Sequence, residues 1–366
     1  MGIVPQHLLE GENLNEAQFN RRPVGTGPYV FQEWRDGERL VFTANPDYFD
    51  GPVGAVQRIV MTFVADENSR VAMLLNGTAD YARLSPRAAA QLEGDPRFNM
   101  VQPPSASIYQ MTRPTDNPVL SDPAVRRALA RAVNREQIVR TILTGAGGPA
   151  FGPILDGHWA YDPQATVEYD VEAAREILAE AGWTEGGDGI MTQGGQPLSF
   201  TIMYLANIVE DRDMALALRS DFARIGVDAN VDGVASPGYQ DRLDEASFLH
   251  GVGLPYDPDY VLWSRYHSQF ADDGDPGTNP SRMRNPAVDA ALEAGRSTVD
   301  REERRQAYVQ MQQALLEDGS YLFIAQRPHI VAVSSRFTGV EPKMMGSPHA
   351  FVRGVFWNIE TWGLNP

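Results

Sequence analysis

The chain has 366 residues, of which 43% are hydrophobic and 22% charged, a composition typical of a globular protein. Because a single hydrophobic core rarely serves more than roughly 250–300 residues, two lobes are expected. The formal charge of −17 disfavours nucleic acid and anionic membranes as partners, since binding to phosphates requires clustered Lys and Arg. The lack of Cys excludes disulfides, thiolate zinc sites and a cysteine nucleophile, and without an apolar run of about 18 residues no membrane-spanning helix is expected.

The first part of the chain combines strand patterns with turn signals. Residues 23–48 predict two strands joined by a hairpin turn at Asp36-Gly37, because apolar and polar side chains alternate before this dipeptide. A further strand is expected over residues 55–64 and a short helix over 68–75. This part is therefore expected to be mixed α/β.

Helical periodicity dominates the middle of the chain. A helix is expected over residues 122–143, with Pro in its first turn, and a second over 170–182, between an aspartate cap and a glycine stop. The strand 197–205, the helix 211–226 and the strand 227–234 form a βαβ unit. Such a unit requires parallel strands and a crossover helix on one face of the sheet.

The last part of the chain continues the mixed pattern. A glycine-rich loop is expected over residues 272–280, followed by two helices within 284–319 and a strand-like segment over 321–335. No internal repeat, long linker or low-complexity tract interrupts the sequence. The chain segments that connect the two lobes must therefore be short.

The sequence shows no catalytic or metal-binding motif. Gly25-Thr26-Gly27 lacks the third glycine and the following helix of a dinucleotide-binding loop, so a turn that enters a strand is the favoured interpretation. No serine lies in a strand-to-helix elbow, and no base stands beside a nucleophile pattern. Among the histidines, His267 is the strongest candidate for a site formed in three dimensions. The six histidines, none at a spacing suited to a metal, are His7, His158, His250, His267, His329 and His349.

One unusual segment, residues 247–266, joins an apolar strand-like run to a turn rich in Gly and Pro. The turn presents Tyr256, Asp257 and Asp259 directly before the start of a helix that contains aromatic residues. Aromatic faces and a few hydrogen-bond acceptors on one loop are typical of a binding site. The structural alternative is that Asp257 caps the helix and Tyr256 packs against the core.

Five segments in the same order resemble the family 5 extracellular solute-binding proteins, which serve ABC importers for dipeptides, oligopeptides and nickel. The first resembles the family's Pro-Val-Gly-Thr-Gly-Pro-Tyr strand and the Asn-Pro-Asp-Tyr-Phe that follows it. The others resemble two helices, a loop and a later helix of the family. The segments are RRPVGTGPYVFQEWRDGERLVFTANPDYFDG (21–51), NPVLSDPAVRRALARAVNREQIV (117–139), AAREILAEAGW (173–183), PYDPD (255–259) and MRNPAVDAALEAG (283–295).

The resemblance implies a periplasmic-binding-protein-like (type II) α/β fold, with mixed sheets flanked by helices and a ligand cleft between two lobes that close by a hinge motion. Residues 1–135 together with 333–366 would form part of lobe I, and residues 136–332 would form lobe III. Family members carry a signal peptide, further strands of lobe I and a small extra lobe ahead of the segment at which this chain begins. The chain is therefore expected to lack an N-terminal part.

The resemblance also implies candidate ligand contacts. Tyr109 falls where relatives place an aromatic contact, and Val252 replaces a tryptophan that supplies a stacking surface. Pro255 stands where peptide-binding relatives place the aspartate that pairs with an α-amino group. Tyr256 matches a ligand-contacting tyrosine of the nickel-importer branch, but that branch's histidine is Asp259 here. The full candidate set is Tyr109, Met111, Val252, Leu254, Tyr256, Asp257, Arg265 and His267.

We therefore expect a substrate-binding subunit of an ABC importer, which captures a peptide or similar small solute and delivers it to the membrane permease, without catalysis or a cofactor. A nickel chelate or an oligosaccharide is the alternative cargo. A carboxylate-dependent hydrolase is the alternative from another class, and a remnant without function is the third. The protein is expected to be a monomer in the periplasm or outside the cell, and to be membrane-associated at full length.

Overall fold

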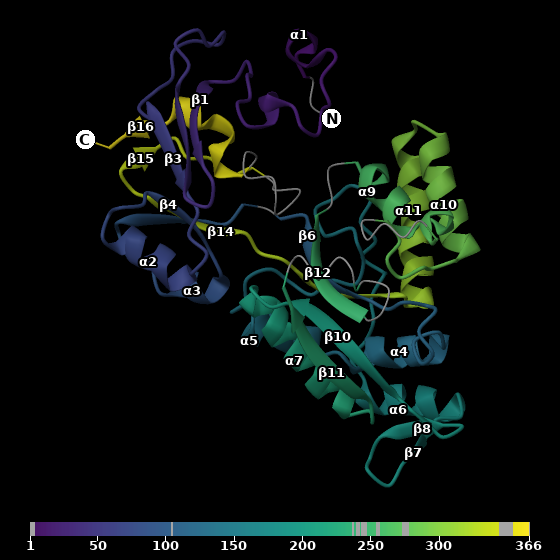
Figure 1. The fold of residues 1–366 in the computed structure, drawn as a ribbon. Helices are drawn as coiled ribbons and strands as arrows, with labels where there is room; N and C mark the ends of the chain where they lie inside the picture. Colours follow the sequence, from purple (N-terminus) through teal and green to yellow (C-terminus); the bar gives the residue numbers. More distant parts are fainter. Residues whose placement is uncertain are drawn as a thin grey trace. The chain divides into compact units, whose positions relative to one another are not determined.

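The structure, a computed structural model, describes residues 4–103, 105–235, 238, 242, 247–253, 257–272, 278–343 and 354–365, with the backbone alone for 247–253. The chain forms two compact units (Figure 1). Unit 1 contains Met1–Pro103, Ile330–Lys343 and Phe351–Pro366, and unit 2 contains Pro104–His329 and Met344–Ala350.

Unit 1 begins with a three-stranded antiparallel sheet. Gly37 takes the left-handed conformation, with φ +70°, that the tight turn between the first two strands requires. The hairpin predicted at Asp36-Gly37 is thus confirmed, and the predicted third strand pairs with the second. The elements are α1 (Gln6–Leu9), η1 (Gln18–Asn20), β1 (Tyr29–Arg35), β2 (Arg39–Ala44) and β3 (Arg58–Thr62).

A second three-stranded sheet in unit 1 joins distant parts of the chain. Its central strand comes from the end of the chain and pairs antiparallel with two strands from the N-terminal part. Val331 and Val333 of the central strand belong to an apolar cluster with Trp362. The elements are β4 (Tyr81–Leu84), β5 (Phe98–Val101) and β14 (Ile330–Ser334), with α2 (Glu67–Leu75), α3 (Pro86–Ala90), β15 (Phe337–Thr338), η4 (Val355–Thr361) and β16 (Gly363–Leu364) in the same unit.

Unit 2 is built on a mixed five-stranded sheet with the strand order β11-β10-β12-β6-β13. The predicted βαβ unit is confirmed, because β10 pairs in parallel with β11; it also pairs in parallel with β12. β6 pairs antiparallel with β12 and β13, and all its residues are buried. The strands are β6 (Ser107–Thr112), β10 (Ser199–Leu205), β11 (Asp228–Val234), β12 (Ser247–Gly253) and β13 (Tyr321–Gln326).

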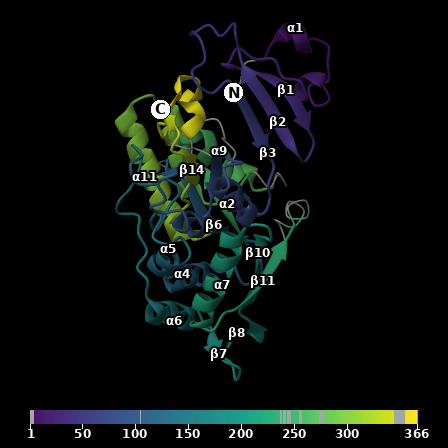
Figure 2. The same cartoon turned by 90° about the vertical axis from the view of Figure 1, so that its left-hand side faces the viewer.

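Helices cover both faces of this sheet (Figure 1; Figure 2). Residues of α4 to α7 form one apolar core with Tyr109 and Met111, and residues of α9 to α11 form another with Ile108. Side chains that alternate along β6 thus contribute to two different cores, one on each face of the sheet. The remaining elements are α4 (Pro123–Ala132), α5 (Arg135–Thr141), α6 (Val171–Glu180), β7 (Thr184–Glu185), β8 (Met191–Gln193), β9 (Gln196–Pro197), α7 (Val209–Ala223), α9 (Asp259–Tyr266), η3 (Ser268–Phe270), α10 (Pro286–Ser297) and α11 (Arg301–Asp318).

Capping side chains set the helix starts, and one of them corrects a prediction. Asp170 caps α6 by accepting a backbone hydrogen bond at 2.8 Å, as the sequence predicted. The single helix predicted over residues 122–143 is wrong, because two helices, α4 and α5, occupy this range. Val133 is extended, and the Asn134 side chain accepts a backbone hydrogen bond at 3.0 Å that begins α5.

The units divide after Pro103, whereas the sequence predicted a lobe boundary near residue 135. The difference arises because β6 and α4 lie between these positions and both contribute to a core of unit 2. The second crossing falls between His329 and Ile330, close to the predicted position near residue 333. The consecutive strands β13 and β14 therefore belong to different units.

A buried arginine joins α4 to the end of α11. Arg126 is 4% exposed, and its guanidinium donates to the backbone carbonyls of Leu120, Ser121 and Asp318 at 2.8–2.9 Å. The Asp318 carboxylate lies 3.7 Å away. Burial of a guanidinium is costly unless its donors are satisfied, and here backbone oxygens satisfy most of them.

We expect Arg126→Met to lower the free energy of unfolding by about 3 kcal/mol, because three carbonyls and a carboxylate lose their partner inside the protein. Arg127→Met is the matched control, since Arg127 is the exposed neighbour on the same helix, and its effect should stay within about 0.5 kcal/mol. Urea unfolding followed by circular dichroism measures both. Equal stability of the two variants would show that Arg126 contributes no more than a surface residue.

Candidate ligand-binding site

Four strands of the unit 2 sheet end at one edge, which we call the carboxyl edge. β10, β11 and β12 are parallel, and β13 runs the same way because both β12 and β13 are antiparallel to β6. After β10 the chain enters α7 on one face of the sheet, and after β12 it reaches α9 on the other. Ligands of open α/β sheets bind where connections diverge in this way. The carboxyl edge is therefore the candidate site.

A cation, an aromatic ring and a carboxyl group from three different elements lie at this edge. Arg327 directly follows β13, and its backbone N–H donates to the Ser107 carbonyl at 2.8 Å, which places it beside the start of β6. The carbon at the centre of its guanidinium lies 5.3 Å from the centroid of the Tyr109 ring. Asp211, in the first turn of α7, is 2% exposed, and its charge interacts with that of Arg327.

The Asp211 carboxyl group lies where a negative charge is poorly solvated. Burial raises its pKa from 3.8 to about 7, an effect that the Arg327 charge opposes and the Glu210 charge reinforces. Its Oδ1 atom is buried and has no hydrogen-bond partner among the described residues. Burial also raises the pKa of Tyr109 well above its usual range, so the phenol stays protonated.

A second polar group lies just before α9. Asp257 accepts two hydrogen bonds from Arg304, at 2.8 and 3.1 Å, and these bonds are the largest cause of the lowered pKa of Asp257. The Arg304 guanidinium also lies 5.4 Å from the ring of Trp159. Asp257 also accepts the backbone N–H of Asp259 at 3.0 Å. The N-cap residue of α9 is Pro258, with no side-chain cap, so the alternative in which Asp257 caps this helix is wrong.

His267 and Arg265 lie along and after α9. His267 is 8% exposed, its Nδ1 accepts the backbone N–H of Gln269 at 3.1 Å, and its ring lies 4.1 Å from that of Trp263. These contacts give His267 a role in ending one helix and starting the short η3 helix. The Arg265 backbone carbonyl accepts a hydrogen bond from the Tyr321 hydroxyl at 3.0 Å.

The structure brings together only part of the candidate set that the sequence predicts. Tyr109 lies beside Arg327 at the carboxyl edge, and Met111 lies two residues further along β6 with 0% exposure, inside the core. Val252 lies in β12 opposite Ile108, while Leu254 and Tyr256 fall outside the described residues. The sheet separates two groups of candidate residues. Tyr109 and Met111 face one core, whereas the α9 segment that carries Arg265 packs into the core on the opposite face.

Arg327 and Asp211 are absent from the candidate set that the sequence predicts. Arg327 stands at the end of an apolar strand pattern, and Asp211 stands in the first turn of a helix that follows a strand. Both positions are ends of elements at a carboxyl edge, which the predicted βαβ unit could have indicated for Asp211. The proximity of the two depends on the pairing of β13 with β6, which no local pattern shows.

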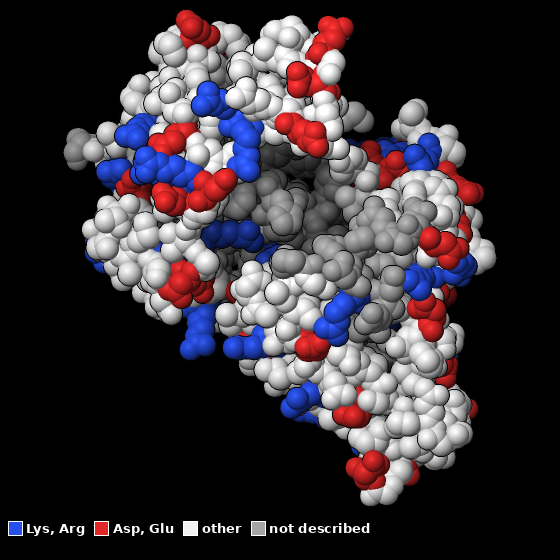
Figure 3. Space-filling view, viewed as in Figure 1, with Lys and Arg blue, Asp and Glu red and all other residues white. Residues whose placement is uncertain are grey.

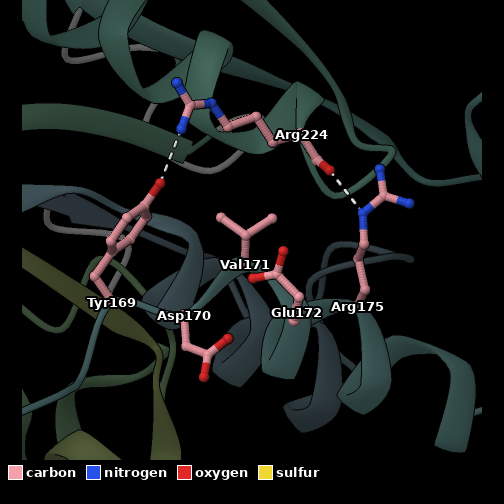
Figure 4. Close-up of a pocket in the computed structure, with 6 residues that line it drawn as sticks. All are labelled: Tyr169, Asp170, Val171, Glu172, Arg175 and Arg224. Atoms are coloured by element: carbon pink, nitrogen blue, oxygen red, sulfur yellow. Dashed lines mark hydrogen bonds between the residues drawn. The ribbon is translucent and has the colours of Figure 1, made fainter.

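A separate depression lies at the start of α6 (Figure 4). Arg224 donates to the Tyr169 hydroxyl at 2.9 Å, and Arg175 donates to the Arg224 carbonyl at 2.8 Å. Acidic and basic groups both line it, so it favours neither sign of ligand charge. Its lining residues, none of which belongs to the carboxyl edge, are Tyr169, Asp170, Val171, Glu172, Arg175 and Arg224.

Neither a metal-binding cluster nor a membrane-spanning helix is found in the described part of the chain. Acidic and basic side chains are interspersed on the face that Figure 3 shows. Within the described residues, no group of three or more His, Cys, Asp or Glu could hold a metal ion. None of the helices in the described part of the chain has the length and apolar character needed to cross a membrane.

Two α/β units and a mixed sheet with diverging connections at its carboxyl edge define a periplasmic-binding-protein-like (type II) fold, and known proteins share it. Residues 1–273 match the model of the bacterial extracellular solute-binding proteins, family 5 Middle. The chain therefore belongs to this family of solute-binding proteins, as its sequence motifs predicted.

Individual relatives cover almost all of the chain. Protein XP55 of Streptomyces lividans is 38% identical over 345 residues, which are 94% of this chain and 63% of XP55. NikZ of Campylobacter jejuni, solved in complex with Ni(L-His), superposes with a TM-score of 0.90 and 31% identity over 99% of this chain and 73% of its own. AppA of Bacillus subtilis, solved with a nonapeptide, superposes with a TM-score of 0.85 and 26% identity, over 100% of this chain and 72% of its own. The chain spans less than two thirds of the length of these curated relatives, from 55% to 66%, with 63% for XP55.

We expect Asp211→Asn to stabilise the protein relative to wild type as pH rises. The folded pKa of about 7 lies above the ordinary 3.8, so ionisation of Asp211 costs stability progressively between about pH 4 and pH 7. The amide avoids this cost, so the variant should gain roughly 1–3 kcal/mol at pH 8 and little at pH 4. Urea unfolding at both pH values measures the difference. Asp213→Asn, on the same helix but with 37% of its side chain exposed, is the control and should change the free energy of unfolding by less than about 0.5 kcal/mol.

Proposed function

We propose that this chain is the solute-binding part of a substrate-binding subunit of an ABC importer. It captures a peptide or similar small solute at the carboxyl edge of unit 2 and delivers it to the membrane permease, acting as a monomer outside the cytoplasm. The observation that carries this proposal is the agreement of nearly the whole chain with NikZ and AppA, two structures solved with bound solutes. Family membership and the diverging connections at the carboxyl edge support it independently.

A nickel chelate is the second candidate cargo. The likeness to NikZ, solved with Ni(L-His), favours it, since both the TM-score and the identity exceed those for AppA. The described residues offer no cluster of three metal ligands, so in this case the chelating molecule would supply most of the donors to the metal. The protein would then recognise the chelator rather than the ion.

An enzymatic role has less support. The family consists of solute-binding proteins, and the polar groups that the structure describes at the carboxyl edge include no nucleophile paired with a base. Asp211 is a carboxyl group with a pKa near neutrality, as a general acid or base requires, but at 2% exposure it does not reach solvent. A carboxylate-dependent hydrolase is therefore the alternative function that the test must distinguish from solute binding.

The test is a melting-shift screen of the purified protein, followed by calorimetry. The compounds are di- to hexapeptides, L-histidine with and without Ni²⁺, and short oligosaccharides. A solute at about 100 times its Kd should stabilise the protein by about 2.7 kcal/mol and raise Tm by several degrees. One responding class would name the cargo. Hydrolysis of any compound, without binding of its products or of the other classes, would favour the enzyme instead.

A further inference from the structure

His267 stands where α9 ends and η3 begins. It is 8% exposed, and its backbone N–H donates to the Trp263 carbonyl at 3.1 Å, which completes the last turn of α9. Its ring Nδ1 accepts the backbone N–H of Gln269 at 3.1 Å, which begins η3. The imidazole therefore acts as a capping side chain at the junction of the two helices.

The hydrogen bond from Gln269 determines the state of the imidazole. A ring nitrogen that accepts a backbone N–H carries no proton, so the neutral ring carries its proton on Nε2. Nε2 is buried and has no hydrogen-bond partner among the described residues. Histidine is the side chain whose charge ordinarily changes between about pH 5 and pH 8, and a second proton on this ring can enter only at Nδ1. Protonation therefore removes the acceptor on which the Gln269 N–H depends.

Two carboxylates of α10 face the two ring nitrogens. α10 lies beside α9 (Figure 1), and Asp289 and Glu293 stand one helical turn apart on it. Asp289 Oδ1 lies 3.8 Å from Nδ1, and Glu293 Oε1 lies 3.6 Å from Nε2. Neither contact is short enough for a hydrogen bond, but both attract a charged imidazolium. The protonated ring is thus drawn toward α10.

The other neighbours of the ring do not cancel these two negative charges. In the described part of the chain, no third carboxylate lies within 4 Å of the ring nitrogens, and η3 carries no charged side chain. The neutral Trp263 ring lies 4.1 Å from the imidazole, and the neutral Asn279 amide donates to the His267 carbonyl at 3.2 Å. The guanidinium carbon of Arg296 lies 3.9 Å from the Trp263 ring, but Arg296 also pairs with Asp259 of α9 at 3.1 Å, which offsets its charge.

We propose that His267 is a pH-sensitive switch at the junction of α9 and η3. The neutral ring accepts the Gln269 N–H and so holds the start of η3. The protonated ring releases that N–H and pairs with Asp289 and Glu293, which ties the end of α9 to α10. The step adds one proton from water to Nδ1 and needs no other reactant. It invokes no solute, so the inference is independent of the proposed function.

Hydrogen exchange of backbone amides tests the switch in the whole chain. We expect the protection factor of the Gln269 amide to fall about fivefold to tenfold from pH 8 to pH 5, as the loss of one capping hydrogen bond predicts. Protection factors already correct for the intrinsic pH dependence of exchange. The nitrogen chemical shifts of the His267 ring should show the proton on Nε2 at pH 8 and protons on both nitrogens at pH 5.

Variants then assign the effect to His267 and to α10. His267→Asn should keep the protection of the Gln269 amide high at both pH values, because asparagine caps helices without titrating. Glu293→Gln should move the loss of protection to lower pH, because one of the two attracting charges is gone. His158→Asn is the control, since His158 Nδ1 likewise accepts a backbone N–H, that of Ala160 at 3.2 Å, but lies outside α9 and η3. The Gln269 amide should respond to pH in this control as it does in the wild type.

The outcomes decide each part of the proposal. Constant protection of the Gln269 amide in the wild type would overturn the switch, and so would a neutral ring that carries its proton on Nδ1. A folded His267→Asn variant with the wild-type pH dependence would overturn it as well. An unchanged pH dependence in Glu293→Gln would show that the pairing with α10 is wrong. Melting temperatures report folding, and if His267→Asn does not fold, the ring shifts and Glu293→Gln still decide. Solute binding is not involved, so failure here leaves the proposed function standing.

Discussion

The antiparallel pairing of β6 with β12 on one side and β13 on the other is the constraint on which unit 2 depends. It joins residues 107–112, 247–253 and 321–326, which lie far apart in sequence, so the chain must close long loops before this sheet can form. Burial of every β6 residue offsets that cost, and its alternating side chains enter the cores on both faces. Because β12 and β13 both oppose β6, their carboxyl ends necessarily fall at the same edge. The candidate site is thus a consequence of strand order rather than of any single loop.

Local chemistry explains why much of the fold could be predicted from the sequence. The turn at Gly37 needs a left-handed residue, and the cap at Asp170 needs an acceptor side chain, so each is visible within a few residues. The βαβ unit is visible because periods of 2 and 3.6 alternate along the chain. The break between α4 and α5 was missed because the apolar stripe continues across it, although Asn134 is a strong capping residue. At this position the local capping signal and the apolar periodicity predict different structures, and the capping residue decides where α5 begins.

The site was less predictable, for a physical reason. Tyr109 could be named only through resemblance to a family, since a tyrosine in an apolar strand is most simply a core residue, and it is indeed 3% exposed. Asp211 looks like an ordinary acidic residue in the first turn of a helix, where the helix dipole favours negative charge. Its unusual property, a pKa of about 7, arises from burial that the tertiary structure creates. Arg327 gains significance only through its neighbours across the sheet, so no window of sequence contains the information.

Because the net charge of the chain is −17, a positively charged side chain at the carboxyl edge matters for the electrostatics of the candidate site. A negative protein repels a free carboxylate at long range, but salt screens that repulsion over about 8 Å at physiological ionic strength. At contact distance the local groups decide, and a partly buried arginine over an aromatic ring acts where few waters or counter-ions intervene. Asp211 interacts with this cation, and yet burial raises the pKa of its carboxyl group to about 7. Burial therefore outweighs the neighbouring positive charge at Asp211, so desolvation has a larger effect on this group than attraction to the arginine.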